Sequence, residues 1–259
     1  MKKKKFKMNT FQRCKLLRKK VLEISQKVQA IHIGGSFSMV EILDTIYFQT
    51  KKKTDRVIVS KGHAAIIQYV ILNMIGNMPN KILNSYTKED GLLGVHPEIH
   101  LPGIECSTGS LGHGLGFANG LAYANKNKNV YVVMSDGELM EGSVWEAALL
   151  SSSLNLNNLI VIIDNNDLQS ATRASETHPT LYPIKEKFKD FGWDAVECDG
   201  HDTKKLKANI LKNHIKPKVI IAKTIKGYPI SYMMDNPIWH YRSPNKEEYK
   251  LAIREINEK

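Results

Sequence analysis

The sequence has few cysteines and no long apolar run, and both absences exclude whole classes of protein. Its three cysteines, Cys14, Cys106 and Cys198, lie far apart and form no CxxC pair, so we expect neither a disulfide framework nor a zinc site. No apolar run approaches the roughly 20 residues that cross a bilayer. The lysines at positions 2–5 are not followed by the apolar core of a signal peptide. We therefore expect a cytoplasmic protein with no membrane partner.

Nucleic-acid-binding motifs are also absent, although the chain is basic. Lysine and arginine total 37 against 26 acidic residues, which gives a formal net charge of +11. Much of this excess lies at the two ends of the chain and in tracts such as 51–53 and 204–205. No helix-turn-helix, zinc-finger or RNP-like pattern accompanies the charge. We interpret the lysines as a solvated surface, or as an attraction for phosphorylated sugars, and expect no nucleic-acid partner.

Short apolar segments alternate with helical patterns along the 259 residues. The patterns predict strands at 56–60, 130–134, 159–163, 195–198 and 219–222, and helices at 9–31, 39–49, 64–75, 111–125, 143–154, 182–190 and 203–212. This alternation indicates an α/β fold with a mostly parallel sheet covered by helices on both faces. We expect a single domain over 1–259, with a basic N-terminal extension of about 8 residues.

Three segments interrupt the alternation. Gly34-Gly35 predicts a break after the first helix, and Ser38 a cap for the second. Residues 87–110 are rich in glycine, proline and histidine, with little periodicity, which predicts an ordered loop region. Residues 167–180 are polar, and we expect no regular structure there.

Polar side chains follow two of the predicted strands directly. Asp136-Gly137 comes after the strand at 130–134, and Asp164-Asn165-Asn166 after the strand at 159–163. In a parallel sheet both tips face the edge where such folds bind ligands. A carboxylate, an amide oxygen and a backbone carbonyl suit Mg²⁺, and Gly137 lets backbone N–H groups approach a phosphate. Strand-end Asp and Asn also serve as caps and turns, so the pattern alone leaves that alternative open.

The segment from Asp136-Gly137 to Asn165-Asn166 resembles the thiamine diphosphate signature, a GDG-like start and an NN end with Asp136 and Asn166 166 − 136 = 30 residues apart. Further segments resemble the N-terminal part of transketolases, in family order from about residue 15 to 250. They are His32-Ile33-Gly34-Gly35-Ser36-Phe37-Ser38 (HPGGSLS), Ser60-Lys61-Gly62-His63-Ala64 (SKGHA), Gly94-Val95-His96-Pro97 (GHP), Ser107-Thr108-Gly109-Ser110-Leu111-Gly112-His113-Gly114 (STGSLGQG), Asp136-Gly137-Glu138-Leu139-Met140-Glu141-Gly142 (DGELQEG), and Ile225-Lys226-Gly227 with Trp239-His240.

The resemblance implies a thiamine diphosphate-binding fold of the diphosphate-binding type and a set of site residues. Metal ligands would be Asp136, Asn166 and the backbone oxygen of Leu168, for Mg²⁺ or for Ca²⁺ or Mn²⁺ in its place. Cofactor contacts would come from His63, Gly109, Ser110, Leu111, Gly137, Glu138, Glu141, Asn166 and His240.

Four of the nine histidines, His32, His63, His96 and His240, fall where transketolases place active-site histidines. Imidazole can donate and accept a proton near neutral pH, which suits a substrate with several hydroxyls and one carbonyl. The resemblance places His32 and His96 near the substrate, and His63 and His240 nearer the diphosphate and the reacting carbon. We expect no catalytic role for His100, His178, His201 and His214, and His113 is a weaker candidate.

The implied activity is transfer of a two-carbon ketol group from a ketose, expected to be phosphorylated, to an aldose. The family's activating glutamate lies on a pyrimidine-binding domain that would follow residue 259. We therefore expect a partner subunit that carries that domain, in an α₂β₂ assembly.

Two alternatives stay open at this point. The chain could be the α subunit of a 2-oxo acid dehydrogenase or part of a deoxyxylulose-phosphate synthase-like enzyme, or it could be a non-catalytic scaffold of the same fold. Ile33, Ser135 and Gly227-Tyr228-Pro229 depart from the family pattern, so the sugar is not specified.

Overall fold

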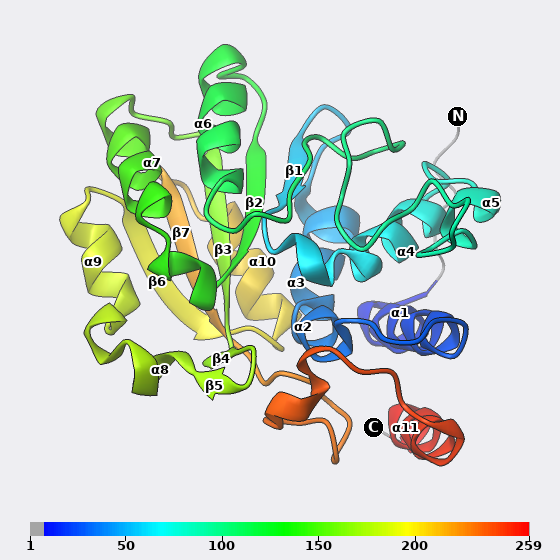
Figure 1. The fold of residues 1–259 in the computed structure, drawn as a ribbon. Coiled ribbons are helices and arrows are strands. Elements are labelled where there is room, and N and C mark those ends of the chain that lie inside the picture. Colours follow the sequence, from blue (N-terminus) through cyan, green and yellow to red (C-terminus); the bar gives the residue numbers. More distant parts are fainter. Residues whose placement is uncertain (1–7, 259) are drawn as a thin grey trace.

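A five-stranded sheet crosses the centre of the molecule (Figure 1). The computed structural model describes residues 8–258, so the basic extension expected at the N-terminus falls almost entirely outside the described residues. The strands are β1 (Arg56–Val59), β2 (Val130–Ser135), β3 (Leu159–Asn165), β7 (Lys218–Lys223) and β6 (Asp194–Asp199), in that spatial order. Every neighbouring pair is parallel. The predicted parallel sheet is confirmed.

Alternate side chains of each strand enter two separate apolar cores, because successive residues of a strand point to opposite faces. In β1, Val57 and Val59 pack into one core, while Ile58 packs into the other. The first core is covered by α1 (Thr10–Ser25), α2 (Ile33–Ser38), α3 (Val40–Asp44), α4 (Ile66–Met74), α10 (Thr203–Leu211) and α11 (Lys246–Glu258), and the second by α6 (Gly114–Ala124), α7 (Gly142–Ser153) and α9 (Ile184–Asp190). Helices therefore cover both faces, as predicted.

Shorter elements fill the connections. They are η1 (Thr45–Thr50), η2 (Gly62–Ala64), α5 (Asn80–Leu83), η3 (Gly137–Met140), β4 (Leu168–Gln169), β5 (Thr172–Arg173), α8 (Ala174–Thr177), η4 (Pro179–Leu181) and η5 (Pro237–His240). Among the helices that the structure describes, none has both the length and the apolar character that a membrane-spanning segment requires.

The Gly34-Gly35 break was a wrong prediction, and so was the cap at Ser38. Both glycines lie inside α2, and Ser38 is the last residue of that helix. A Cβ on Gly34 would stand 2.8 Å from the backbone oxygen of Trp239, so this glycine allows two backbones to pack closely rather than ending a helix. The first helix ends at Ser25, earlier than predicted.

Residues 167–180 also correct the prediction, because they are not structureless. β4 and β5 pair antiparallel in a short hairpin, and α8 and η4 follow it. Asp167 and Ser170 take positive φ angles of 62° and 43°, which turns the chain out of β3 and around the hairpin. The hairpin holds Leu168 close to the tip of β3.

Register brings the strand ends to one edge. Ser135 of β2 pairs with Asp164 of β3, and Asn165 of β3 pairs with Lys223 of β7. The segments that follow β1, β2, β3 and β7 therefore begin side by side, where parallel sheets present their ligand-binding residues.

Candidate active site

Asp136 and Asn166 lie at the tips of adjacent strands. The Asp136 carboxylate accepts hydrogen bonds from the backbone N–H of Gly137 at 2.9 Å and of Asp167 at 2.5 Å. The side-chain oxygen of Asn166 accepts one from the N–H of Leu168 at 3.1 Å. Asp136 is 1% exposed and Asn166 is 8% exposed. The structure thus brings together the three residues predicted as metal ligands.

The environment of Asp136 suits a bound cation. Burial raises the pKa of this carboxyl to about 6, and the charge of Asp164 raises it further. A nearby cation would favour the ionised form of a carboxylate held in this way. The described residues contain no cluster of three or more His, Cys, Asp or Glu side chains that could hold a metal. A metal here would therefore need the amide oxygen of Asn166 and the carbonyl of Leu168, which are hard oxygen donors.

A second carboxylate, Asp164, lies under this corner in a fully buried hydrogen-bond network. It forms a close ion pair with the Lys61 ammonium and accepts hydrogen bonds from the hydroxyls of Thr224 and Ser38, the latter at 2.6 Å. Burial alone would raise the pKa of Asp164, but the charge of Lys61 and these hydrogen bonds hold it below its usual range. The network joins the ends of β1, β3 and β7 to α2.

Glu138, predicted as a cofactor contact, is fully buried. Its carboxylate accepts a short hydrogen bond from the Ser60 hydroxyl and bonds from the N–H groups of Gly112 at 2.9 Å and Ser135 at 3.4 Å. Burial raises its pKa. Glu138 thereby ties the β1 and β2 loops to the glycine-rich segment before α6.

The other predicted cofactor contacts surround that segment. Glu141 is exposed at the start of α7 and packs beside Gly112, where an added Cβ would lie 2.6 Å from the Glu141 Cβ. Ser110 is exposed, and Leu111 is half-buried. Gly137 begins η3 directly after Asp136.

Three of the predicted catalytic histidines form one cluster. The ring centroid of His32 lies 5.1 Å from those of both His63 and His240, and the centroid of His63 lies 5.7 Å from that of His240. These rings come from the start of α2, from η2 and from η5. The Nδ1 of His32 is buried without a hydrogen-bond partner among the described residues, so the cluster has an unused polar atom.

The clustered histidines are neutral at physiological pH. Burial, reinforced by His240, lowers the pKa of His32 to about 3. Burial, reinforced by Lys226, lowers the pKa of His240 to about 4, and burial also holds the pKa of His63 well below its ordinary value. A neutral imidazole has one donor and one acceptor nitrogen, so each ring can hold a substrate hydroxyl from either side of the bond.

His96 lies beside Gly109, across from this cluster. A Cβ added to Gly109 would stand 2.9 Å from the His96 Cγ, which explains the glycine there. The charge of His96 contributes to the low pKa of His32, so the fourth predicted histidine is also close to the cluster. Of the remaining histidines, His201 contacts Glu41 and His214 the backbone of Lys216, while the ring of His178 contacts Thr177.

Lys226 links the metal corner to the histidines, and its role was not predicted from sequence. Its Nζ donates to the carbonyl of Leu168 at 3.0 Å and lies 2.9 Å from the Nδ1 of His240. Burial, with the charge of Lys61, lowers its pKa to about 8. An apolar context for two lysines, here Lys61 and Lys226, is the signal that could have pointed to them, because lysine is rarely buried without a partner.

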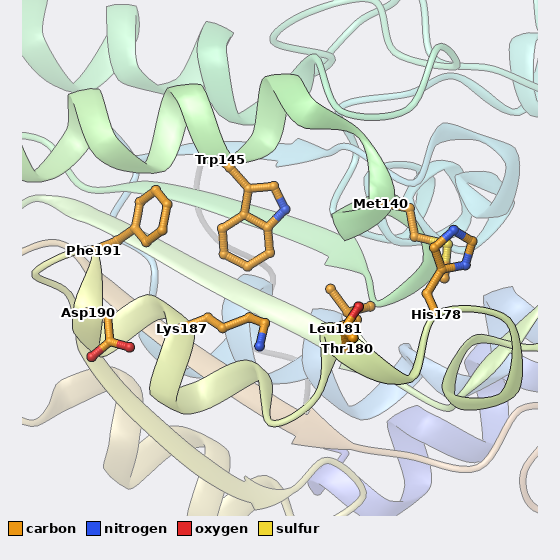
Figure 2. Close-up of a pocket in the computed structure, with 8 residues that line it drawn as sticks. All are labelled: Met140, Trp145, His178, Thr180, Leu181, Lys187, Asp190 and Phe191. Atoms are coloured by element: carbon orange, nitrogen blue, oxygen red, sulfur yellow. The ribbon is translucent and has the colours of Figure 1, made fainter.

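Two cavities lie away from this edge. One, of about 410 Å³, is drawn in Figure 2, where Trp145 of α7 and Phe191 at the end of α9 face it together with Lys187 and Leu181. The other, of about 730 Å³, lies between α1 and α10. Neither is lined by the predicted catalytic histidines, so the candidate site is an open edge of the sheet in this chain.

Comparisons with known proteins agree with this geometry. Residues 11–250 match the family model described as transketolase, thiamine diphosphate binding domain. The chain is 36% identical over 258 residues to one named subunit of the apulose-4-phosphate transketolase of Phocaeicola vulgatus, and the match covers 93% of this chain and 92% of that protein. It is 31% identical over 258 residues to the 6-deoxy-6-sulfo-D-fructose transketolase subunit SqwG of a Clostridium species, covering 93% and 94% of the two chains.

Solved structures show the same fold. The transketolase of Leishmania mexicana superposes with a TM-score of 0.91 at 25% identity, over 96% of this chain and 41% of that one. The chain thus spans about two fifths of that longer transketolase, whereas it spans nearly the whole length of the Phocaeicola and Clostridium proteins. The transketolase resemblance is confirmed, and the 2-oxo acid dehydrogenase alternative has no support among these relatives. This chain belongs to the transketolase family, as the half that carries the thiamine diphosphate-binding domain.

Proposed function

We propose that this chain is the diphosphate- and metal-binding subunit of a two-subunit transketolase that moves a two-carbon ketol group from a phosphorylated ketose to an aldose. The observation that carries the proposal is the meeting of two features at one sheet edge. The buried Asp136–Asn166 corner lies there, and Lys226 bridges it to the neutral histidines. A diphosphate held at the corner would place its attached ring toward those histidines.

The proposed metal is Mg²⁺, with Ca²⁺ or Mn²⁺ able to replace it. Asp136, Asn166 and the Leu168 carbonyl would hold the ion, and diphosphate oxygens would complete its coordination. Lys226 now donates to the Leu168 carbonyl, and its ammonium would also attract the diphosphate. The glycine-rich segment at 109–112 and Gly137 would supply backbone N–H groups to the cofactor.

Thiamine diphosphate, when bound, supplies the carbanion chemistry that breaks and makes the carbon–carbon bond. The chain's own residues would orient the sugar and move its protons. His32 and His96 would hold the substrate hydroxyls and carbonyl, and His63 and His240 would act nearer the diphosphate. Because His32 and His240 have low pKa values, each is available as a neutral donor and acceptor at pH 7.

The partner subunit would carry the pyrimidine-binding domain and the activating glutamate. Two features support a shared site: the candidate site is an open edge in this chain, and the Phocaeicola relative is named as one subunit of its enzyme. An α₂β₂ assembly in the cytoplasm would complete two such sites by two-fold symmetry. The named sugars of the relatives are an apulose phosphate and a sulfofructose, so a specialised sugar is as credible here as a pentose phosphate.

Calorimetry tests the proposal against the scaffold alternative. Thiamine diphosphate with Mg²⁺ is titrated into the complex of this chain with its partner, and into the same complex carrying Asp136→Asn. We expect saturable binding to the first and at least about 100-fold weaker binding to the second, a difference of roughly 2.7 kcal/mol. Absence of binding to the unmodified complex would favour a non-catalytic scaffold.

A further inference from the structure

The cavity of about 730 Å³ between α1 and α10 is a binding site in its own right. Its size falls within the range of small-ligand pockets, and it lies on the face of the sheet that α1, α3 and α10 cover. Residues 11, 14, 15 and 18 of α1 and residues 204, 207, 208 and 211 of α10 recur at helical spacing along its two walls. The two helices therefore face each other across the cavity.

The outer part of this cavity is apolar. Phe11 from α1 is 55% exposed and Leu211 from α10 is 56% exposed, and Ala208 lies between the lysines and Leu211 on the same wall. Large apolar side chains left half-exposed on facing walls gain free energy when an apolar group lies between them. A ligand with a flat or branched hydrocarbon body would cover both.

The charge of the cavity is positive. Lys15, Lys204 and Lys207 line it. The acid at its floor, Glu41, is already neutralised by a bidentate ion pair with Arg18 at 2.7 Å. No hydrogen bond or ion pair involves the Lys207 ammonium within residues 8–258. An anionic group would therefore meet uncompensated positive charge at the cavity wall.

We propose that this cavity binds a small amphipathic anion, in which one sulfonate, phosphate or carboxylate group is attached to an apolar body. The anionic group would lie against Lys204 and Lys207, and the apolar body between Phe11 and Leu211. The binding site is separate from the proposed ketol-transfer site and does not rest on it.

The inner wall connects the cavity to the candidate active site. Tyr228 lines the cavity, stacks on His201 at 4.0 Å and accepts a hydrogen bond from Arg18 through its backbone oxygen at 3.1 Å. The next residue but one toward the N-terminus is Lys226, which contacts the Leu168 carbonyl. A bound anion would thus rest against the segment that positions Lys226.

The test uses two fluorescent probes with similar bodies. The first, 8-anilino-1-naphthalenesulfonate, has the anionic group, and the second, N-phenyl-1-naphthylamine, lacks it. Each is titrated into the complex of the chain and its partner, unmodified and with Lys207→Glu, Ala208→Trp or Lys212→Glu. Lys212 directly follows the same helix and lies outside the cavity, so its variant makes the same change in net charge and serves as the matched control.

We expect one saturable sulfonate site per chain. Ala208→Trp, an exposed position where a large side chain fills the cavity, should weaken it more than about tenfold, and Lys207→Glu about tenfold, since an exposed charge contributes up to roughly 1 kcal/mol and its reversal about twice that. Lys212→Glu should leave sulfonate binding unchanged, and the uncharged probe should be insensitive to Lys207→Glu. Sulfonate binding that survives Ala208→Trp, or that Lys212→Glu weakens as much as Lys207→Glu, would overturn the proposal. Thermal unfolding of each variant shows that the fold is retained.

Discussion

The carboxylate of Asp136 accepts a 2.5 Å hydrogen bond from the backbone N–H of Asp167. Asp167 stands between Asn166 and Leu168, so this bond fastens the tip of β2 directly to the segment that follows β3. The sheet register alone would place the two tips side by side; the hydrogen bond also fixes which way the Asp136 side chain points. The oxygens of the metal corner are therefore held before any ion arrives, and pre-organisation of this kind lowers the free energy that binding must spend on ordering.

Replacement of Asp136 by Asn should weaken metal binding far more than it changes the fold. The variant keeps an oxygen but loses the negative charge, so we expect the affinity for Mn²⁺ in the presence of thiamine diphosphate to fall by roughly 100-fold, about 2.7 kcal/mol. Electron paramagnetic resonance of free Mn²⁺ measures this in the complex with the partner. Asp235→Asn, at an exposed surface acid paired with Arg173, should have no effect. Equal losses in the two variants would contradict the assignment of the metal corner.

The Lys61–Asp164 pair should be costly to break on one side only. Lys61 is 1% exposed and Asp164 is 0% exposed, so Lys61→Met leaves a carboxylate buried without its counter-charge. We expect the free energy of unfolding to fall by about 3–5 kcal/mol. In the double variant Lys61→Met, Asp164→Asn the charge is removed as well, and most of that loss should be recovered. Urea unfolding of the four chains gives the coupling, and a double variant as unstable as the single one would show that packing rather than charge explains the loss.

His32 should act on the reaction and not on cofactor affinity. Its Nδ1 has no partner among the described residues, and its low pKa keeps the ring neutral. We expect His32→Asn to lower kcat by about 10²–10⁴-fold while the affinity for thiamine diphosphate changes by less than about threefold. The assay uses the complex with the partner, and His100→Asn, at an exposed loop position, is the control. A normal kcat in the His32 variant would remove this residue from the proposed mechanism.

Stability should fall on acidification because the histidine cluster resists protonation. His32 and His240 have folded pKa values of about 3 and about 4, whereas an unfolded histidine titrates near pH 6.5. Below about pH 6.5 the unfolded chain binds more protons than the folded one, so the free energy of unfolding declines as pH falls toward 4 and is fully retained above 6.5. After a discount for partial exposure, we expect these two groups to contribute about 2 kcal/mol of the decline between pH 6.5 and 5.

The variant pair His240→Asn and His178→Asn isolates this effect. Urea unfolding at several pH values should show a shallower decline for the first and an unchanged one for the second, because His178 is exposed. If both variants follow the parent curve, the acid sensitivity comes from groups other than the cluster.

Much of the fold follows from local patterns in the sequence. The strand at 159–163 consists only of apolar residues, all buried, and a run of that kind has few alternatives to a central parallel strand. The Gly34-Gly35 prediction failed because the same residue type serves two purposes. Glycine ends helices, but here it lets α2 approach the backbone at Trp239, a contact between residues about 200 positions apart that no local pattern contains. The hairpin at β4 and β5 was missed for a related reason, since it depends on positive φ at Asp167 and Ser170.

The candidate site divides in the same way. Asp136, Asn166 and the four histidines lie in segments that resemble a family signature, so they could be named from the sequence. Their spatial partners could not. Asp164 was seen only as part of a strand tip, and its pairing with Lys61 joins residues 103 positions apart. The apolar setting of Lys61 and Lys226 hinted at a role, but only the fold shows that they neutralise and connect the two halves of the site.

The dependence of ketol transfer on both subunits is the most direct test. This chain, its partner and their mixture are each assayed with thiamine diphosphate, Mg²⁺, and a panel of ketose and aldose phosphates. The account predicts no turnover by this chain or its partner in isolation, and turnover by the mixture that chelation of the metal abolishes. Ketol transfer by this chain without a partner, or a mixture that binds the cofactor yet transfers no ketol group from any sugar tested, would contradict it.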